Sequence, residues 1–332
     1  MTDLPLHGGP DALGVPLHDF STNSNGCGPC PVAVQALAQV DASRYPDPRY
    51  TALRQQLADF HGVSDRRVVL AGSASEFIFR ITARVAGQGA HAVSVPLHAY
   101  GDYAQAARAH GLAVVPSGQP GALHWACEPS SPLGQPHGLA GWADAQGIRV
   151  LDCAYAPLRL SGQASVRPEI LQTVWQLYTP NKALGLTGVR AAYAVAPLGA
   201  EGDVMALDQL CPSWPVGAHG VALLQAWVSS ATQDWLGQSR ATLRDWKAQQ
   251  ISLCESLGWP CLPSDANFFC TQPAVPFGLT LVQALGDLRA QGIKLRDTAS
   301  FGLPGHVRLG VLPPPAQAAL KMAWHLLLKA PR

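Results

Sequence analysis

The sequence predicts an α/β fold built on a mostly parallel sheet, and two observations lead to this class. Strand-like apolar runs alternate with helical stretches between residues 68 and 196, which is the pattern of βαβ units. The chain has 332 residues, 48% of them hydrophobic, which is enough for the cores of one large and one smaller domain. We expect the large domain to span residues 41–225, and residues 1–40 and 226–332 to form a small domain with an N-terminal arm.

Seven short apolar runs predict the strands of the sheet. They cover residues 68–70, 92–95, 113–115, 123–126, 148–151, 174–178 and 189–195. Helical stretches such as residues 100–110 separate several of them, and a long amphipathic stretch, residues 219–257, predicts one helix that links the two domains. In a sheet of this kind a ligand binds beyond the carboxyl ends of the strands.

A single lysine stands in an apolar, glycine-rich turn directly after the strand predicted for residues 174–178. Lys182 has no charged neighbour between Glu169 and Arg190. Burial at a strand end favours the neutral amine, which is the nucleophile that a carbonyl cofactor requires, and the guanidinium of Arg190 suits a phosphate. On these residues alone, a structural lysine in a loop and an arginine that opens the next strand are an equal alternative.

The segment from Asn181 to Arg190 resembles the cofactor-lysine motif of fold-type I pyridoxal 5′-phosphate (PLP) enzymes, the aspartate aminotransferase superfamily. That motif has Ser or Asn before the lysine, then small or apolar residues, and a Gly-x-Arg that Gly188 and Arg190 match. The resemblance implies the PLP-dependent transferase fold of type I and PLP as cofactor. It also implies that Lys182 forms a Schiff base, with Asn181 beside the cofactor and Arg190 on its phosphate.

Two further motifs precede this segment in the order that the superfamily has. Asp152 and Tyr155 follow the strand at 148–151 as an Asp-x-x-Tyr pair, in which the carboxylate keeps the pyridine nitrogen protonated and the phenol donates to the ring oxygen. Gly72, Ser73 and Ala74 resemble the phosphate cup, because a helix start offers free backbone N–H groups. Without the resemblance, Asp152 closes a turn and Ser73 caps a helix.

Two more segments complete the cofactor set. The stretch from Tyr100 to Tyr103 keeps the aromatic-x-x-Tyr spacing that places a ring on the pyridine, so Tyr100 is the predicted stacking residue and His98 the alternative. Residues 127–134 keep both prolines and the glycine of the superfamily's Asn-Pro-Asn-Asn-Pro-Thr-Gly stretch. Ser131, however, stands where an asparagine would bind the ring oxygen, so its role stays open.

The strand-like context around Arg308 resembles the segment that carries the substrate-carboxylate arginine. A carboxylate suits a planar, two-pronged donor, which arginine provides and lysine does not. Many relatives have a further arginine a few residues later, whereas residues 311–315 contain none. The second contact to a substrate anion is therefore unassigned.

The N-terminal segment bears on the reaction. His7-Gly-Gly9 and the Asp-Phe-Ser-Thr-Asn-Ser-Asn stretch at 19–25 resemble the opening of L-threonine-O-3-phosphate decarboxylases of cobalamin biosynthesis, with Gly26 where those have proline. The resemblance gives His7 a contact to the substrate phosphate and Asn23 a place near the substrate; a terminal residue without a role is the alternative for His7. We expect a PLP-dependent decarboxylase, with an aminotransferase of the histidinol-phosphate type as the alternative.

The dipeptide Tyr45-Pro46 bears on whether the chain forms a homodimer. It resembles the one with which the histidinol-phosphate aminotransferase branch sends a tyrosine to the cofactor phosphate of the other subunit. This resemblance implies a homodimer, although a plain turn explains the same residues.

Composition excludes several other classes of protein. The formal net charge is +1 and 14% of the residues are charged, which leaves no electrostatic footprint for nucleic acid or an anionic membrane. No apolar stretch approaches the ~20 residues of a spanning helix, and no signal-peptide pattern opens the chain. We expect a cytoplasmic enzyme that acts on a small-molecule amino acid or amino-acid phosphate.

The cysteines offer a remote alternative. Cys27-Gly-Pro-Cys30 has the dithiol spacing of thioredoxin-like oxidoreductases. The residues before it are polar and turn-forming rather than a strand, so a thiol–disulfide protein lacks its expected context. No second Cys-x-x-Cys follows among the C-terminal cysteines, and we expect no metal site.

Overall fold

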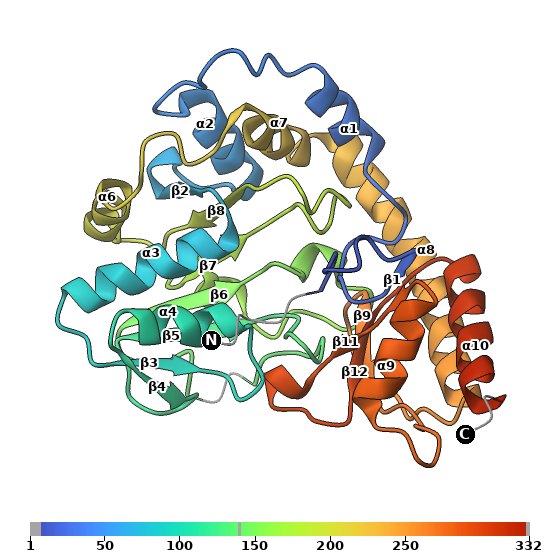
Figure 1. Cartoon of the computed structure of the whole chain (residues 1–332). Coiled ribbons are helices and arrows are strands. Elements are labelled where there is room, and N and C mark those ends of the chain that lie inside the picture. Colours follow the sequence, from blue (N-terminus) through green and yellow to red (C-terminus); the bar gives the residue numbers. More distant parts are fainter. Residues whose placement is uncertain (1–7, 139–140, 330–332) are drawn as a thin grey trace.

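The computed structural model describes residues 8–138 and 141–329, and its centre is a seven-stranded sheet (Figure 1). The strands lie in the order β2-β8-β7-β6-β5-β3-β4. They are β2 (Val68–Ala71), β3 (Ala92–Val95), β4 (Ala113–Pro116), β5 (Leu123–Cys127), β6 (Ile148–Asp152), β7 (Trp175–Tyr178) and β8 (Ala192–Val195). From β7 to β4 all neighbours pair in parallel, while β8 is antiparallel to β2 and β7. The predicted α/β fold with a mostly parallel sheet is confirmed.

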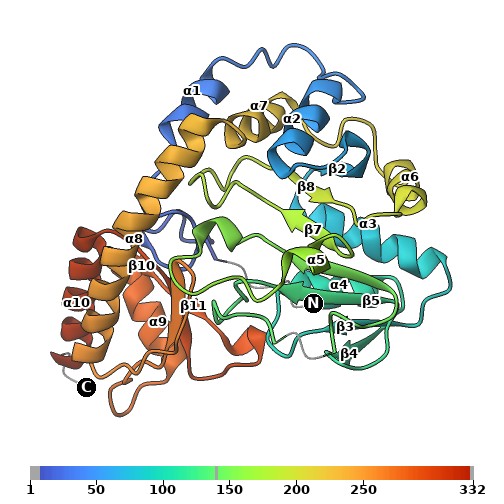
Figure 2. The same cartoon turned by 180° about the vertical axis from the view of Figure 1, so that it is seen from behind.

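Helices cover both faces of this sheet, which explains why its strands read as apolar runs rather than alternating patterns. In β2, Val68 and Leu70 belong to the core on one face, and Val69 and Ala71 to the core on the other. Figures 1 and 2 both show the first group of helices gathered at the top. This group is α1 (Pro31–Ala38), α2 (Thr51–His61) and α7 (Ala218–Trp227); the opposite face has α3 (Ala74–Gly87), α4 (Gly101–Ala109) and α6 (Glu201–Gln209). The short α5 (Pro168–Leu171) precedes β7.

The C-terminal residues build a second, smaller sheet. Its antiparallel strands lie in the order β11 (Arg296–Asp297), β12 (Val307–Gly310), β9 (Phe268–Thr271). The helices around it are α8 (Ser230–Ser256), α9 (Leu281–Ala290) and α10 (Pro314–Lys329). Their shared core includes Trp259, Phe269 and Trp324. The short strand β1 (His18–Asp19) pairs with β10 (Ile293–Lys294), which brings the N-terminal segment to these elements.

The single helix predicted for residues 219–257 is wrong, because two helices, α7 and α8, occupy this stretch. Ser229 separates them in an extended conformation (φ −71°, ψ 143°), and its Oγ accepts a hydrogen bond from Thr232 N at 3.3 Å. A serine oxygen at this position satisfies a free N–H of the first turn, so it starts a new helix. α8 packs on α1 and α7 at one end and on α10 at the other, and it therefore still links the two sheets.

The division into residues 41–225 and the remainder stays a prediction. Within the predicted arm, β1 pairs with β10 beside the small sheet, whereas α1 packs against α7 beside the large one. Among the helices of residues 8–138 and 141–329, none combines the length and the apolar character that crossing a bilayer requires.

Candidate active site

Most of the predicted site residues lie at one edge of the large sheet. Asp152 is the last residue of β6, Lys182 lies in the turn after β7, and Gly72 follows β2. Ser131 is in the loop after β5, and Arg190 precedes the antiparallel β8, which starts at this same edge. This is the carboxyl edge of the parallel strands, where open α/β sheets bind their ligands.

Asp152 is a buried carboxylate with two hydrogen-bond donors. Tyr103 OH donates to Oδ2 at 2.6 Å, and Ala154 N donates to Oδ1 at 2.9 Å. Burial raises the pKa of the Asp152 carboxyl, while these donors and the nearby charge of Lys182 lower it. The donors therefore favour the ionised form, which is the form that can neutralise a buried cation.

Tyr103 is a site residue that the sequence analysis did not assign. Its side chain is fully buried, and its ring stacks on Trp125 with 4.3 Å between the centroids. Its spacing from Tyr100 was visible in the sequence. The pairing with Asp152 was not, because it depends on how α4 packs against the sheet.

Lys182 projects over an aromatic ring. Its Nζ lies 5.4 Å from the centroid of the Tyr155 ring. The backbone of the turn is held by Asn25 N, which donates to Lys182 O at 2.9 Å. The side chain of Asn181 is used inside the turn, where it bonds Thr179 Oγ1 at 2.9 Å and the carbonyl of Thr187 at 3.3 Å. The structure thus gives Asn181 a part in shaping the turn that presents Lys182.

The glycine inside this turn is required by the backbone. Gly185 has φ +68°, and a Cβ added there would lie 2.5 Å from Gly28 O. A side chain is excluded both by this close approach and by the left-handed conformation. The turn after β7 is therefore locked against the segment that holds Cys27 and Cys30.

The N-terminal segment enters the site from the small sheet. Asn23 Nδ2 donates to Tyr155 OH at 3.1 Å, and Asn23 Oδ1 is buried without a hydrogen-bond partner among the described residues. Ser21 O accepts a hydrogen bond from Arg308 Nη2 at 3.1 Å. The structure thus places Asn23 beside Tyr155, and Ser21 of the same segment beside Arg308. His7 lies outside the described residues.

Gly26, the departure from the family's N-terminal pattern, has a steric reason. A Cβ at this position would lie 2.4 Å from Val311 O. Proline carries a Cβ as well, so it does not fit this backbone path.

The predicted phosphate cup lies at the start of α3. Ser73 Oγ accepts from Glu76 N at 3.0 Å, and Gly72 N donates to Glu76 Oε2 at 3.2 Å. Ala74 is the first residue of the helix. Ser73 is therefore an N-cap, as the structural alternative held, and the same helix start also offers N–H groups to an anion. Arg190 is exposed, and within the described chain its side chain has no hydrogen-bond or ion-pair partner.

The two candidates for the stacking residue take different places. Tyr100 OH lies 3.2 Å from Ser75 Oγ, and its ring is edge-on to Tyr103 with 5.9 Å between the centroids. Burial raises the pKa of Tyr100. His98 instead faces the small sheet, where its Nδ1 lies 2.7 Å from Phe301 O. Of the two candidates, Tyr100 therefore lies beside Tyr103, the residue that donates a hydrogen bond to Asp152.

Two buried arginines lie side by side on the small sheet. Arg308 in β12 pairs in register with Arg296 in β11, and they are 6% and 5% exposed. Arg308 Nη1 donates to Ser131 Oγ at 3.3 Å, while Arg308 Nε is buried and has no hydrogen-bond partner within residues 8–138 and 141–329. In the described part of the chain no carboxylate forms an ion pair with Arg308. Burial, followed by the charge of Arg308, lowers the pKa of Arg296 to about 10.

Arg296 is a candidate for the second anion contact that the sequence leaves unassigned. It stands twelve positions before Arg308 rather than after it, on the neighbouring strand. Two buried like charges repel each other, and an anion between them relieves that cost. Both arginines lie within residues 293–310 of the sequence. Their spacing, however, does not predict the antiparallel pairing that places Arg296 next to Arg308.

The loop that carries Ser131 is anchored by an ion pair between a buried glutamate and a partly buried arginine, which the sequence analysis did not identify. Glu128 Oε1 lies 2.7 Å from Arg159 Nη2 and accepts from Ser165 N at 2.7 Å. Arg159 Nη1 lies 3.7 Å from Asp265 Oδ2, beside the start of the small sheet. Glu128 thereby fixes the loop on which Ser131 meets Arg308.

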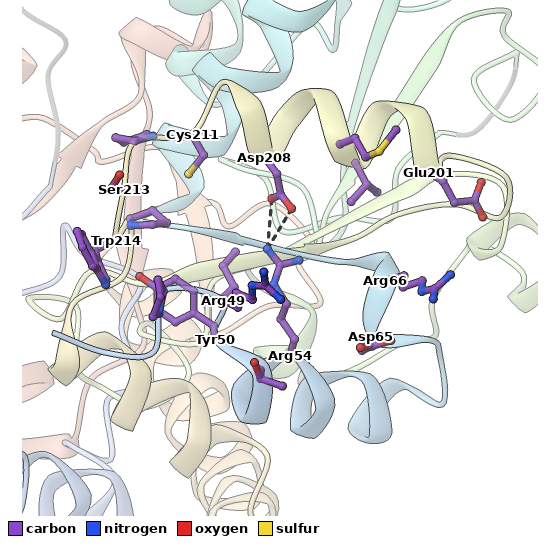
Figure 3. Close-up of a pocket in the computed structure, with 17 residues that line it drawn as sticks. Arg49, Tyr50, Arg54, Asp65, Arg66, Glu201, Asp208, Cys211, Ser213 and Trp214 are labelled. Carbon is purple, nitrogen blue, oxygen red and sulfur yellow. Dashed lines mark hydrogen bonds and ion pairs between the residues drawn. The ribbon is translucent and has the colours of Figure 1, made fainter.

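Tyr45 lies apart, at the surface. It is 78% exposed, and its ring stacks on Trp214 with 4.4 Å between the centroids. It borders a hollow of about 420 Å³ between α1 and α7. A larger pocket, of about 800 Å³, is lined by α2, α6 and the loop at 211–215, and Figure 3 shows Arg54 paired with Asp208 in it. None of the predicted site residues lines this larger pocket.

The thiols of the Cys-x-x-Cys segment are turned toward α8. Cys27 Sγ lies 3.7 Å from Ser239 O, and Cys30 Sγ lies 4.0 Å from Thr232 Oγ1. Burial raises the pKa of the Cys27 thiol, whereas redox exchange requires the thiolate. The geometry therefore gives no support to the thiol–disulfide alternative. The described residues also contain no group of three or more His, Cys, Asp or Glu that could hold a metal ion.

Comparison with known proteins agrees with this geometry. The family model described as aminotransferase class I and II matches residues 16–119 and 122–324. A histidinol-phosphate aminotransferase from Thermobifida fusca (strain YX) is 30% identical over 341 residues, covering 92% of this chain and 88% of that protein.

Two solved structures show the same fold. Histidinol-phosphate aminotransferase from Sinorhizobium meliloti, in complex with pyridoxal-5′-phosphate, has a TM-score of 0.79 at 22% identity and covers 93% of this chain and 90% of that one. L-threonine-O-3-phosphate decarboxylase from Porphyromonas gingivalis has a TM-score of 0.76 at 20% identity and covers 94% of this chain and 99% of that one. Since the family model spans nearly the whole sequence and the fold agrees, this chain belongs to the class I and II aminotransferase family.

Proposed function

We propose that this chain is a PLP-dependent aminotransferase whose amino substrate carries a phosphate, as the names of its sequence relatives describe. The observation that carries the proposal is the pair of buried guanidiniums, Arg296 and Arg308, at the same site as Lys182 and Asp152. Two adjacent guanidiniums, with no carboxylate ion-paired to Arg308 in the described part of the chain, suit a doubly anionic ligand: a phosphate, or a dicarboxylate such as glutamate. The relatives support aminotransfer better than the decarboxylation that we expected first.

The donor set at the sheet edge fits PLP. Asp152 is ionisable and held by two donors, so it suits a protonated pyridine nitrogen. The Tyr155 ring lies next to the Lys182 amine, and its OH accepts from Asn23, whose Oδ1 has no partner among the described residues. When bound, PLP withdraws electrons from the bonds at the α-carbon of an amino substrate. The residues proposed to hold it are Gly72, Ser73, Ala74 and Arg190 at the phosphate, Tyr100 on the ring face, Asp152 at the nitrogen, and Tyr155 and Ser131 toward the ring oxygen, with Asn181 shaping the turn.

Lys182 is proposed to act as the acid–base group. Its Nζ would take the proton from the substrate α-carbon and deliver a proton to the cofactor carbon next to the amino nitrogen. This transfer separates aminotransfer from decarboxylation. The Tyr155 ring beneath Nζ limits where the amine can reach. The hydrogen bond from Asn25 N to Lys182 O keeps the backbone of the turn fixed during this transfer.

The arginines are proposed to orient the substrate. Arg308 offers Nη1 and Nη2 toward the loop of Ser131 and the carbonyl of Ser21, and Arg296 stands on the neighbouring strand. A carboxylate or phosphate that spans both would set the α-carbon toward Lys182. Charge-assisted contacts of this kind fix geometry as well as affinity.

A second candidate function is L-threonine-O-3-phosphate decarboxylation. One observation favours it: Asn23, from the segment that resembles the opening of those decarboxylases, donates to Tyr155 OH, and its Oδ1 has no partner among the residues that the structure describes. In that case the bond broken at the α-carbon is the one to the carboxylate, and Lys182 returns a proton to the same carbon.

Assembly as a homodimer is part of the proposal. Tyr45 is largely exposed and stacked on Trp214, so its hydroxyl is available to a second copy of the chain. We propose that it reaches the cofactor phosphate of the partner. Mixing inactive Lys182→Ala protein with inactive Tyr45→Phe protein checks this, because mixed dimers regain one intact site only if the tyrosine acts across the interface.

The experiment that tests the reaction uses purified protein loaded with PLP. It is incubated with histidinol phosphate and 2-oxoglutarate, with glutamate as readout, and separately with L-threonine O-3-phosphate, with carbon dioxide as readout. Glutamate formation that is lost in Lys182→Ala supports the aminotransferase. Carbon dioxide release without glutamate formation transfers the chain to the decarboxylases, and a protein that binds no PLP overturns both readings.

A further inference from the structure

One aromatic side chain touches both arginines of the site. The ring centroid of Phe301 lies 5.0 Å from Arg296 Cζ and 5.5 Å from Arg308 Cζ. On Arg308 a second ring, that of Phe268, also lies at 5.5 Å. Phe268 is fully buried in the sheet, whereas Phe301 is half-buried in a short turn and contacts the arginines from outside the paired strands.

The turn that carries Phe301 ends in a glycine and is hydrogen-bonded to a histidine that follows a strand of the large sheet. Gly302 has φ +74°, a conformation that favours glycine, and it closes the turn behind Phe301. His98, in the segment after β3 of the large sheet, lies with Nδ1 2.7 Å from Phe301 O. Because a carbonyl only accepts, Nδ1 carries the proton and donates it. This bond joins the large sheet to the turn over the arginines.

An aromatic ring that faces a guanidinium stabilises its positive charge. The face of an aromatic ring attracts a cation, more strongly where water is excluded. It stabilises the charge without using any N–H group, so the in-plane donors stay available for oxygens. Ser300 Oγ, next to Phe301, accepts from Arg296 Nη2 at 2.8 Å, so the same turn also fixes the plane of that guanidinium.

We propose that Phe301, held by His98, is a positioning residue that keeps Arg296 and Arg308 charged, desolvated and oriented for a doubly anionic substrate, either a phosphate or a dicarboxylate. The inference deepens the proposed function, on which it rests for the nature of the substrate. It assigns the selection of doubly anionic substrates to a turn that contacts the arginines rather than to the arginines alone. His98, the alternative stacking residue of the sequence analysis, thereby gains a different part, as the tether of that turn.

The test measures anion binding apart from turnover. PLP-loaded protein is titrated by calorimetry with maleate, an unreactive dicarboxylate, and the dissociation constants of the variants are compared. Phe301→Leu keeps apolar volume but loses the ring, and we expect it to weaken maleate binding roughly tenfold. Phe301→Tyr keeps the ring and should stay within about twofold of the wild type. Phe60→Leu, at a partly exposed phenylalanine of α2, is the matched control and should bind maleate as the wild type does.

The tether has its own pair of variants. His98→Ala removes the donor and should weaken maleate binding about threefold or more. His98→Asn places an amide N–H near the position of Nδ1 and should restore binding. His110→Ala, at an exposed histidine just after α4, is the control.

Kinetics with the amino substrate supply a second readout. A positioning role predicts that Phe301→Leu raises KM and leaves kcat within about twofold, because ground-state and transition-state anion binding are lost together. The proposal is overturned if Phe301→Leu binds maleate as tightly as the wild type, or if Phe301→Tyr is as weak as Phe301→Leu. If no amino substrate turns over while maleate binding still follows the ring, the proposed function fails and the role of Phe301 stands.

Discussion

Replacing Tyr103 by phenylalanine removes one hydroxyl from the deepest part of the site. The lost hydrogen bond is the 2.6 Å contact from Tyr103 OH to Asp152 Oδ2, in a place where both side chains are buried. A hydrogen bond to a charged group contributes about 1.5–3 kcal/mol. Since one pKa unit corresponds to about 1.4 kcal/mol, the pKa of Asp152 should rise by about one to two units. Burial has already raised this pKa, and the variant adds to that direction.

The sign of the kinetic effect follows from which form of Asp152 is needed. In its proposed role the ionised carboxylate would support a protonated pyridine nitrogen, and a raised pKa restricts that form to higher pH. We expect the acid limb of the kcat–pH profile to move upward by about one to two units in Tyr103→Phe. The free energy of unfolding, measured in urea, should fall by about 1–3 kcal/mol because Oδ2 is left without its donor.

Tyr100→Phe is the matched control for this variant. It removes a hydroxyl from the residue just before the same helix, where the partner is Ser75, and it keeps the ring beside Tyr103. Its acid limb should coincide with that of the wild type. If Tyr103→Phe shifts neither the acid limb nor the unfolding free energy, Asp152 does not depend on this hydrogen bond and the reasoning is refuted.

Three further predictions concern the cofactor, the loop anchor and stability. Lys182→Ala should fold as the wild type does but lose the visible absorbance of lysine-bound PLP and at least about a thousandfold in kcat; an unchanged spectrum would place the cofactor elsewhere. Glu128→Gln should lower the free energy of unfolding in urea by about 2 kcal/mol, because the partly buried Arg159 keeps only the more distant Asp265 as counter-charge; a loss below about 1 kcal/mol would contradict this. Burial lowers the pKa of His61 to about 4, so the unfolded chain binds its proton first and stability should fall as the pH drops from about 6.5 to about 4. Urea melts at several pH values check this, and the fall should be smaller in His61→Gln.

Most of the fold could be predicted because its local signals agree with its topology. Each of the seven predicted runs overlaps an observed strand, since a sheet covered on both faces needs continuous apolar stretches. The sequence of residues 219–257 predicts one helix because the amphipathic pattern continues across the interruption between α7 and α8. Only the capping geometry of Ser229 separates α7 from α8, and a serine inside a helical pattern does not reveal whether it caps.

The site was predictable where its residues follow strand ends, and not where strands or loops from distant parts meet. Asp152 and Lys182 are placed by the parallel strands that precede them. Arg296 and Tyr103 join the site only through the pairing of β11 with β12 and the packing of α4. Such contacts link positions without a local pattern, so single-sequence spacing gives no signal for them.

The contacts of residues 19–25 explain why the sequence pattern of this N-terminal segment does not distinguish aminotransfer from decarboxylation. Ser21 offers its carbonyl to Arg308, and Asn25 holds the turn of Lys182 through its backbone N–H and through the 3.0 Å bond from Nδ2 to Ala183 O. These contacts hold the backbone around Lys182 and the side chain of Arg308, and neither depends on which bond at the α-carbon is broken.

Asn23 differs from both, because its Oδ1 is buried next to Tyr155 without a partner among the described residues. Asn23→Ala should therefore separate the two reactions: it removes the amide next to Tyr155 while Ser21 and Asn25 keep the segment in place. A selective loss of carbon dioxide release in this variant would tie Asn23 to decarboxylation, and an equal loss of aminotransfer would make it a general substrate contact.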